Sequence, residues 1–132
     1  MNKILVPLFS LIVSFNAYGE WTFFAESEPS DSDFRTFYVD FDSVKVNGNV
    51  YHWELIDYLK PDQWGDLSAK ILSESDCNIP RKRRMLSQLY YTQPMGEGST
   101  STTNNKPDEW TYITPDSVGE SLLNSVCTYA NQ

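Results

Sequence analysis

The sequence predicts an α+β fold: a small antiparallel β-sheet of about five or six strands, with a carboxy-terminal α-helix packed on one face and held by one disulfide. From Trp21 to Thr92, apolar residues recur mostly at period two, and many are β-branched or aromatic, as in strands. After Pro115, apolar residues fall at spacings of three and four, as in a helix. Two cysteines supply the crosslink.

The first 19 residues resemble an export signal. An apolar run from Ile4 to Phe15 is followed by small residues, Ala17 and Gly19, at the spacing of a signal-peptidase site. An uncleaved anchor is the alternative, but this run is too short to cross a bilayer of about 30 Å. We therefore expect cleavage after Gly19 and one domain over residues 20–132, without a transmembrane span.

The composition of the chain indicates its cellular location and excludes one class of binding partner. No cysteine lies near the expected cleavage site, so we expect a periplasmic, surface or secreted protein without a lipid anchor. The sequence has no Asn-x-Ser/Thr motif, which favours a bacterial envelope protein over a eukaryotic secreted one. The formal net charge of -8 opposes the phosphates of nucleic acid, so we expect no nucleic-acid partner.

Cys77 and Cys127 are the only cysteines and therefore the only disulfide that the chain can form. The strand pattern of Ala69 and Ile71 points Cys77 inward, and Cys127 lies on the apolar stripe of the expected helix. Two free buried thiols are the alternative. An exported chain of this size favours the disulfide, because a small core gains from a crosslink.

The pattern indicates a succession of short strands before the helix. Gly96–Glu109 has no apolar residue to bury and predicts a mobile loop. At the helix start, Ser117 and Glu120 form a capping box, and Pro115 suits the first helical position. The expected strands are residues 21–25, 34–41, a hairpin over 43–59, then 67–77, 84–92 and 110–113.

The hairpin offers two registers. A turn at Gly48 and Asn49 separates apolar from polar side chains better than a turn at Asn47 and Gly48, so we expect the first. It places His52 on the polar, solvated face. The predicted pairs are Val46 with Tyr51, Val44 with Trp53, and Lys45 with His52.

Aromatic residues are predicted on both faces of the sheet, because adjacent residues in a strand point to opposite sides. One helix cannot cover both faces. The second face is therefore either a surface for a partner or for self-association, or it is covered by long loops and by curl of the sheet. The adjacent aromatic pairs are Phe23 with Phe24, Phe37 with Tyr38, and Tyr90 with Tyr91.

Catalytic and metal-binding patterns are missing from the sequence, so we expect no enzyme activity, cofactor or metal. His52 is the only histidine, and both cysteines are assigned to the disulfide. The carboxylates at 31 and 33, and those at 40 and 42, are not followed by the glycine and glutamate of a calcium loop.

Four consecutive basic residues, Arg81, Lys82, Arg83 and Arg84, form the basic run in this acidic chain. In an extended strand, Arg81 and Arg83 face one way and Lys82 and Arg84 the other. The run therefore starts a strand or lies along an exposed edge, where charges deter aggregation. The alternative is a partner-binding patch of positive charge for an acidic segment or a sulfated glycan.

Between Trp21 and Cys127 the chain carries, in order, the segments YVDFDSV, VYHWELIDY, LSAKILSESDC, the basic run, YYTQPMGEG and EWTYITPDSVGESLLNSVC. Their order and spacing resemble the surface-adhesin protein E family of Gram-negative envelope proteins. The most specific elements are the strand with Trp53, the SxK strand ending in Cys77, the glycines after Met95, and the Pro-Asp-Ser helix that carries Cys127.

The resemblance implies an antiparallel sheet, a disulfide from helix to sheet, and a tendency to form homodimers. For the founding adhesin it implies binding of host matrix or serum proteins such as vitronectin and laminin. It therefore favours a non-catalytic adhesin-like protein. The second hypothesis is a periplasmic binding or inhibitory module that docks an endogenous envelope partner through an aromatic sheet face.

Overall fold

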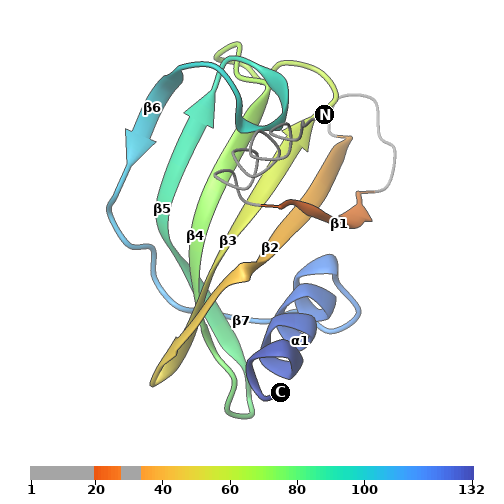
Figure 1. Cartoon of the computed structure of the whole chain (residues 1–132), viewed down its shortest axis with the longest axis vertical. Helices are drawn as coiled ribbons and strands as arrows, with labels where there is room; N and C mark the ends of the chain where they lie inside the picture. Colours follow the sequence, from red (N-terminus) through yellow and green to blue (C-terminus); the bar gives the residue numbers. More distant parts are fainter. Residues whose placement is uncertain (1–19, 28–33) are drawn as a thin grey trace, which may run out of the picture.

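The structure, a computed structural model, describes residues 20–27 and 34–132, so the expected signal segment at 1–19 lies outside the described residues. The sheet order is β1-β2-β3-β4-β5-β6, all neighbours antiparallel, and β7 pairs with the start of β5 (Figure 1). The predicted α+β class is confirmed, with a short seventh strand. The elements are β1 (Thr22–Glu26), β2 (Arg35–Asn47), β3 (Asn49–Tyr58), β4 (Ser68–Asp76), β5 (Lys82–Tyr91), β6 (Thr100–Asn104), β7 (Thr111–Tyr112) and the helix α1 (Val118–Ala130).

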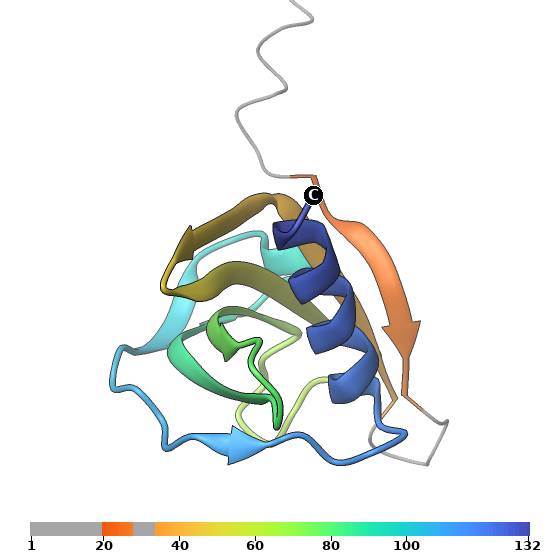
Figure 2. The same ribbon diagram turned by 90° about the horizontal axis from the view of Figure 1, so that it is seen from below.

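The sheet is strongly curled, and α1 lies across the open side of the curl (Figure 2). The apolar face of α1 packs on β2 and β3. Val39 and Val50 of the sheet meet Leu122 and Val126 of the helix, and all four are buried. Burial of side chains of this size stabilises the fold by about 1.5–3 kcal/mol each. The curl and the helix thus enclose one core on the concave face.

The β2–β3 hairpin has neither of the two registers considered from the sequence. Asn47 pairs with Asn49, so Gly48 alone forms the reversal. Its φ of 73° lies in the left-handed region, which glycine adopts without steric cost. Pairing is displaced by one residue, and a displacement of one residue exchanges the two faces of a strand. His52 therefore leaves the face of Lys45 and points to the core side.

Strand β2 is irregular between Asp40 and Lys45, where the register with β3 shifts again. Ser43 bridges the irregularity: its Oγ accepts a hydrogen bond from the Trp53 N–H (2.9 Å) and donates one to the Asp40 carbonyl (2.6 Å). As a result Trp53 pairs with Asp40, and the predicted pair with Val44 is wrong. Hydrophobic periodicity could not predict this irregularity, because it depends on a serine side chain that takes the place of backbone pairing.

Side chains on both faces of the central strand β4 are buried. Ala69 and Ile71 are buried on the concave side, and Ser68 and Glu74 are buried on the convex side. The 3-10 turn η2 (Pro94–Gly96) lies over the convex side. There the Ser68 hydroxyl donates to the Gln93 carbonyl (2.6 Å) and accepts from the Gly96 N–H (2.8 Å).

The segment 96–109, predicted to be a mobile loop, contains the strand β6. All five side chains of β6 are exposed, so the strand is held by its backbone pairing with β5 and not by apolar burial. Ser101 adds a side-chain contact to another segment, since its Oγ donates to Asp66 Oδ1 (2.5 Å). Composition alone could not predict this strand, because it buries no side chain.

The helix start follows the predicted capping box with one correction. Ser117 is the N-cap, and its Oγ accepts from the Glu120 N–H at 3.1 Å. The Glu120 carboxylate accepts in turn from the Asp116 N–H at 3.0 Å. Pro115 precedes the N-cap and is not the first helical residue, because Asp116 has a left-handed φ of 62° that no helix accommodates.

The predicted disulfide is confirmed. Cys77, just after β4, bonds to Cys127 of α1 with an S–S distance of 2.00 Å, and Cys127 is fully buried. The bond fastens the helix to the sheet across 50 residues of chain. Within the described part of the chain, no helix has the length and apolar character that a membrane crossing requires.

We predict that reduction lowers the free energy of unfolding by about 4 kcal/mol, because the disulfide closes a loop of 50 residues in the unfolded chain. Urea unfolding followed by tryptophan fluorescence, with and without a phosphine reductant, measures the loss. The C77S/C127S double variant is the control, since reductant should not change its midpoint. An equal midpoint for the reduced and oxidised wild-type protein would contradict the prediction.

Candidate functional site: the two faces of the basic run

The basic run starts strand β5, as predicted, but it does not lie at a sheet edge. Lys82 and Arg83 pair with β4 on one side and with Tyr112 and Thr111 of β7 on the other. At these two residues the run therefore has a neighbouring strand on each side. Arg81 precedes β5, and because side chains alternate along the strand, Arg83 faces the core whereas Lys82 and Arg84 face the opposite side.

The Arg83 side chain points to the concave face of the sheet, which α1 covers. Its Nη2 donates to Glu54 Oε1 and to Ser73 Oγ, both at 2.8 Å. The side chains of Arg83 and Glu54 are 18% and 9% exposed, so the ion pair is largely removed from water. Charges at such depth require a partner, since an unpaired one costs several kcal/mol. Arg83 is thus committed to the fold.

His52 belongs to the same network, and its predicted solvated position is wrong. The residue is 1% exposed, and its Nε2 lies 2.8 Å from Glu54 Oε2. Among the described residues, no group hydrogen-bonds its Nδ1. The exchange of faces in the hairpin explains the burial. The His52–Glu54 pair therefore lies inside the fold, away from solvent.

The pKa of Glu54 reports the strength of this network. Burial alone would raise the pKa, but the Arg83 charge and the hydrogen bond with His52 outweigh burial and lower the pKa of Glu54 to about 2. Glu54 therefore stays ionised at every pH above this value in the folded protein.

Lys82 and Arg84 point to the opposite face, against aromatic rings that precede and form β7. The Lys82 ammonium lies 5.1 Å from the Trp110 ring centroid and 6.0 Å from that of Tyr112. The Arg84 guanidinium lies 4.7 Å from the Trp110 centroid. Cations over aromatic faces are attracted by about 0.5–1 kcal/mol when partly exposed. We call these four residues the basic–aromatic surface.

Glu74 anchors one member of this surface. Its Oε1 accepts from Arg84 Nε at 2.8 Å, and its Oε2 accepts from Asn49 Nδ2 at 2.9 Å and from the Tyr51 hydroxyl at 3.1 Å. Burial opposes ionisation, but these three donors outweigh it and lower the pKa of Glu74. The hydrogen bond between the Tyr51 hydroxyl and Glu74 also raises the pKa of Tyr51. Lys82, by contrast, makes no ion pair within the described residues.

Arg81 lies beside a groove at the lower end of the sheet. Its Nε donates to the Cys77 carbonyl at 3.1 Å and its Nη1 to Asn124 Oδ1 at 2.5 Å. The groove, of about 350 Å³, also contains Ile79 and Tyr112, which are 86% and 63% exposed. Apolar and cationic groups therefore adjoin at this end of the molecule.

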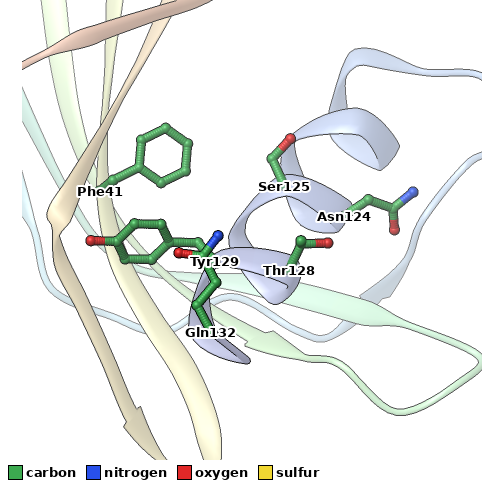
Figure 3. A pocket seen from close by; sticks show the side chains of 6 residues that line it. All are labelled: Phe41, Asn124, Ser125, Thr128, Tyr129 and Gln132. Atoms are coloured by element: carbon green, nitrogen blue, oxygen red, sulfur yellow. The ribbon is translucent and has the colours of Figure 1, made fainter.

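A second groove, of about 460 Å³, runs between β2 and α1 (Figure 3). Phe41 and Tyr129 pack together with ring centroids 5.2 Å apart, and the polar side chains of Asn124 and Thr128 line the helix side. Its lining holds no Asp, Glu, His or Cys side chain. It therefore offers a contact surface rather than a reactive group.

Metal ligands do not gather in the described residues: no group of three or more His, Cys, Asp or Glu side chains is placed to hold an ion. Of the carboxylate pairs noted in the sequence, those at 31 and 33 lie outside the described residues. At the other pair, Asp40 Oδ1 accepts from the Asp42 N–H at 3.1 Å, a local turn contact.

These features define a small, disulfide-fastened module whose charged network is structural and whose outward groups are suited to contacts. The family model of Surface-adhesin protein E matches residues 21–128, so the chain belongs to this family of adhesin-like proteins. Searches of curated proteins and of solved structures gave no match.

We predict that acid weakens the fold through Glu54. Folding lowers the pKa of Glu54 from 4.5 to about 2, so the stabilisation is complete above pH 4.5 and is lost as pH falls toward 2. The linked loss is on the order of 3 kcal/mol. Urea unfolding at a series of pH values measures this loss in the free energy of unfolding. The variant E54Q should be less stable than wild type at neutral pH, and the difference in stability should shrink as pH falls from 4.5 toward 2.

The control is E109Q, which removes an exposed carboxylate from the segment before β7. It should keep the wild-type profile. A gap between wild type and E54Q that stays constant from neutral pH to pH 2 would show that ionised Glu54 does not stabilise the fold.

Proposed function

We propose that this family member is an exported, non-catalytic adhesin-like protein that binds acidic segments or sulfated glycans of host matrix or serum proteins such as vitronectin and laminin. We further propose that residues 1–19 direct export and that the basic run supplies the binding cations. The observation that carries the proposal is the Lys82 ammonium, held against two aromatic rings without an ion pair among the described residues.

The basic–aromatic surface suits an anionic partner for two reasons. A cation that has no carboxylate partner keeps its charge available for a sulfate or carboxylate of the ligand. The rings of Trp110 and Tyr112 restrict the Lys82 side chain, so less conformational entropy is lost on binding. The positive potential is local, since exposed charges are screened over about 8–10 Å.

The adjoining groove adds an apolar component. Ile79 and Tyr112 are largely exposed beside Arg81, and apolar side chains next to cations are typical of the centre and rim of protein interfaces. A protein partner would cover both components, whereas a sulfated glycan would use mainly the cations. The proposal therefore accommodates both kinds of partner, with stronger salt dependence for the glycan.

Replacing all four basic residues would not test binding cleanly. Loss of Arg83 leaves Glu54 buried without its ion-pair partner, and breaking such a pair costs about 3–5 kcal/mol. K82Q and K82Q/R84Q are better variants. Lys82 makes no ion pair with any residue that the structure describes, and Glu74 retains its Asn49 and Tyr51 donors when Arg84 is replaced.

We predict that the wild-type protein binds immobilised vitronectin, laminin or heparin, more weakly at high salt. K82Q should weaken binding by about fivefold, the effect of about 1 kcal/mol from one partly exposed cation, and K82Q/R84Q should weaken it further. Surface plasmon resonance at low and high salt measures both. Heparin is included because it isolates the electrostatic part.

The matched controls are K45Q and K45Q/K106Q, which remove equal charge from exposed positions outside the basic–aromatic surface. They should bind like wild type. Binding weakened equally by these controls would mean that net charge, not this surface, determines affinity. Absence of wild-type binding to all three ligands would overturn the adhesin proposal.

A second candidate function has one specific observation in its favour. Phe23 of edge strand β1 is 55% exposed and packs edge-to-face on Tyr38, with ring centroids 6.0 Å apart. An exposed aromatic at a sheet edge suits docking to an endogenous envelope partner. Under this hypothesis F23A, and not K82Q, would abolish function.

A further inference from the structure

A third groove lies at the opposite end of the sheet from the basic run. It has a volume of about 450 Å³, within the range of small-ligand sites. Its lining comes from the starts and ends of β2, β3 and β5 and from the loop that joins β3 to β4. The side chains that matter below are Tyr58, Tyr90, Lys60, Asp62, Gln63 and Trp64.

Trp64 is the most exposed aromatic residue of this groove, with 76% of its surface accessible to solvent. The loop that carries it is nonetheless fixed. Asp62 Oδ1 accepts from the N–H groups of Trp64 (2.9 Å) and Asp66 (2.8 Å), and Gly65 N donates to the Asp62 carbonyl at 3.0 Å. Gly65 has a left-handed φ of 84°, which closes this turn. The indole is thus presented by an ordered turn.

Tyr58 and Tyr90 line the sheet side of the groove. The Tyr90 hydroxyl donates to Gln88 Oε1 at 2.7 Å, and the Arg35 guanidinium lies 5.3 Å from the Tyr58 ring centroid. Burial, and next the nearby Tyr90, raise the pKa of Tyr58 to about 12. Its hydroxyl therefore stays protonated at neutral pH, and among the described residues no group hydrogen-bonds it.

The polar groups of the groove include both donors and acceptors. Lys60 makes no ion pair within the described residues and offers a donor, Gln63 offers both kinds of group, and Asp62 Oδ2 remains an acceptor. Charges of both signs are present, so the groove does not select a strongly charged ligand. An aromatic face surrounded by mixed donors and acceptors matches a pyranose sugar, which has an apolar C–H face and a rim of hydroxyl groups.

We propose that this groove is a saccharide-binding site, in which a pyranose ring stacks on Trp64 and its hydroxyl groups bond to Lys60, Asp62 and the Tyr58 hydroxyl. A proline-rich peptide could also pack on aromatic rings, but it would leave these polar side chains without ligand partners. The polar rim therefore favours the sugar.

This site is separate from the basic–aromatic surface. Tyr90 is eight residues beyond Lys82 on β5, which is about 25 Å along an extended strand. Substitutions at one site should not alter binding at the other. Failure of one proposal is therefore distinguishable from failure of the other.

The test is saturation-transfer difference NMR with three probes: lactose, N,N′-diacetylchitobiose and 3′-sialyllactose, each at about 10 mM, which reveals millimolar dissociation constants. We expect at least one probe to show transfer to its ring protons with the wild-type protein. W64A should weaken binding by about tenfold or more, as is usual for a central tryptophan. Y58F, which removes only the hydroxyl, should weaken binding less.

V46A is the control, because Val46 is 61% exposed on the β2–β3 hairpin, outside both proposed sites. It should bind the sugars like wild type, and W64A should bind heparin like wild type. The proposal is overturned if none of the three probes binds the wild-type protein, or if W64A binds them undiminished. Unfolding midpoints of the variants exclude loss of fold as the cause.

Discussion

The buried ion pair between Glu54 and Arg83 constrains much of the rest of the molecule. It joins β3 to β5 across the intervening strand β4, on the face that α1 covers. A carboxylate and a guanidinium at this depth must stay together, because separation would leave an uncompensated charge in the core. The pair therefore fixes the positions of both strands and determines which side chain of the basic run faces inward. It also holds His52, whose ring contacts the same carboxylate.

The parts of the fold that follow from local pattern could be predicted from the sequence. Period-two alternation indicated the strands, helical spacing with Ser117 and Glu120 indicated α1, and the inward pattern around Cys77 indicated the disulfide to Cys127. Each of these signals lies within a few residues or depends on the only cysteine pair. The seven-stranded order, the curl and the buried network depend instead on contacts between segments far apart in the chain.

The errors have physical causes at particular residues. One glycine, Gly48, makes the hairpin reversal alone, and the Ser43 hydroxyl replaces part of the backbone pairing of β2. The reversal at Gly48 displaces the register by one residue and accounts for the changed face of His52, and the irregularity at Ser43 shifts the pairing again farther from the turn. The ion pair of Arg83 could not be predicted from the sequence either. Four consecutive cations indicate a surface feature, and the buried acid that pairs with Arg83 lies on another strand. Only Lys82 and Arg84 occupy the outward face that the pattern suggested.

The proposed binding sites lie where the fold leaves the sheet uncovered. The helix α1 closes the concave face and the turn η2 covers the centre of the convex face, so the middle of the sheet is occupied by its own packing. Large apolar side chains remain exposed mainly at the ends: Ile79 and Tyr112 beside the basic run, and Trp64 beside the opposite groove. The disulfide and the buried ion pair hold these ends on one rigid scaffold. A ligand that bound at either proposed site would therefore meet side chains that are already ordered, which would reduce the entropy lost on binding.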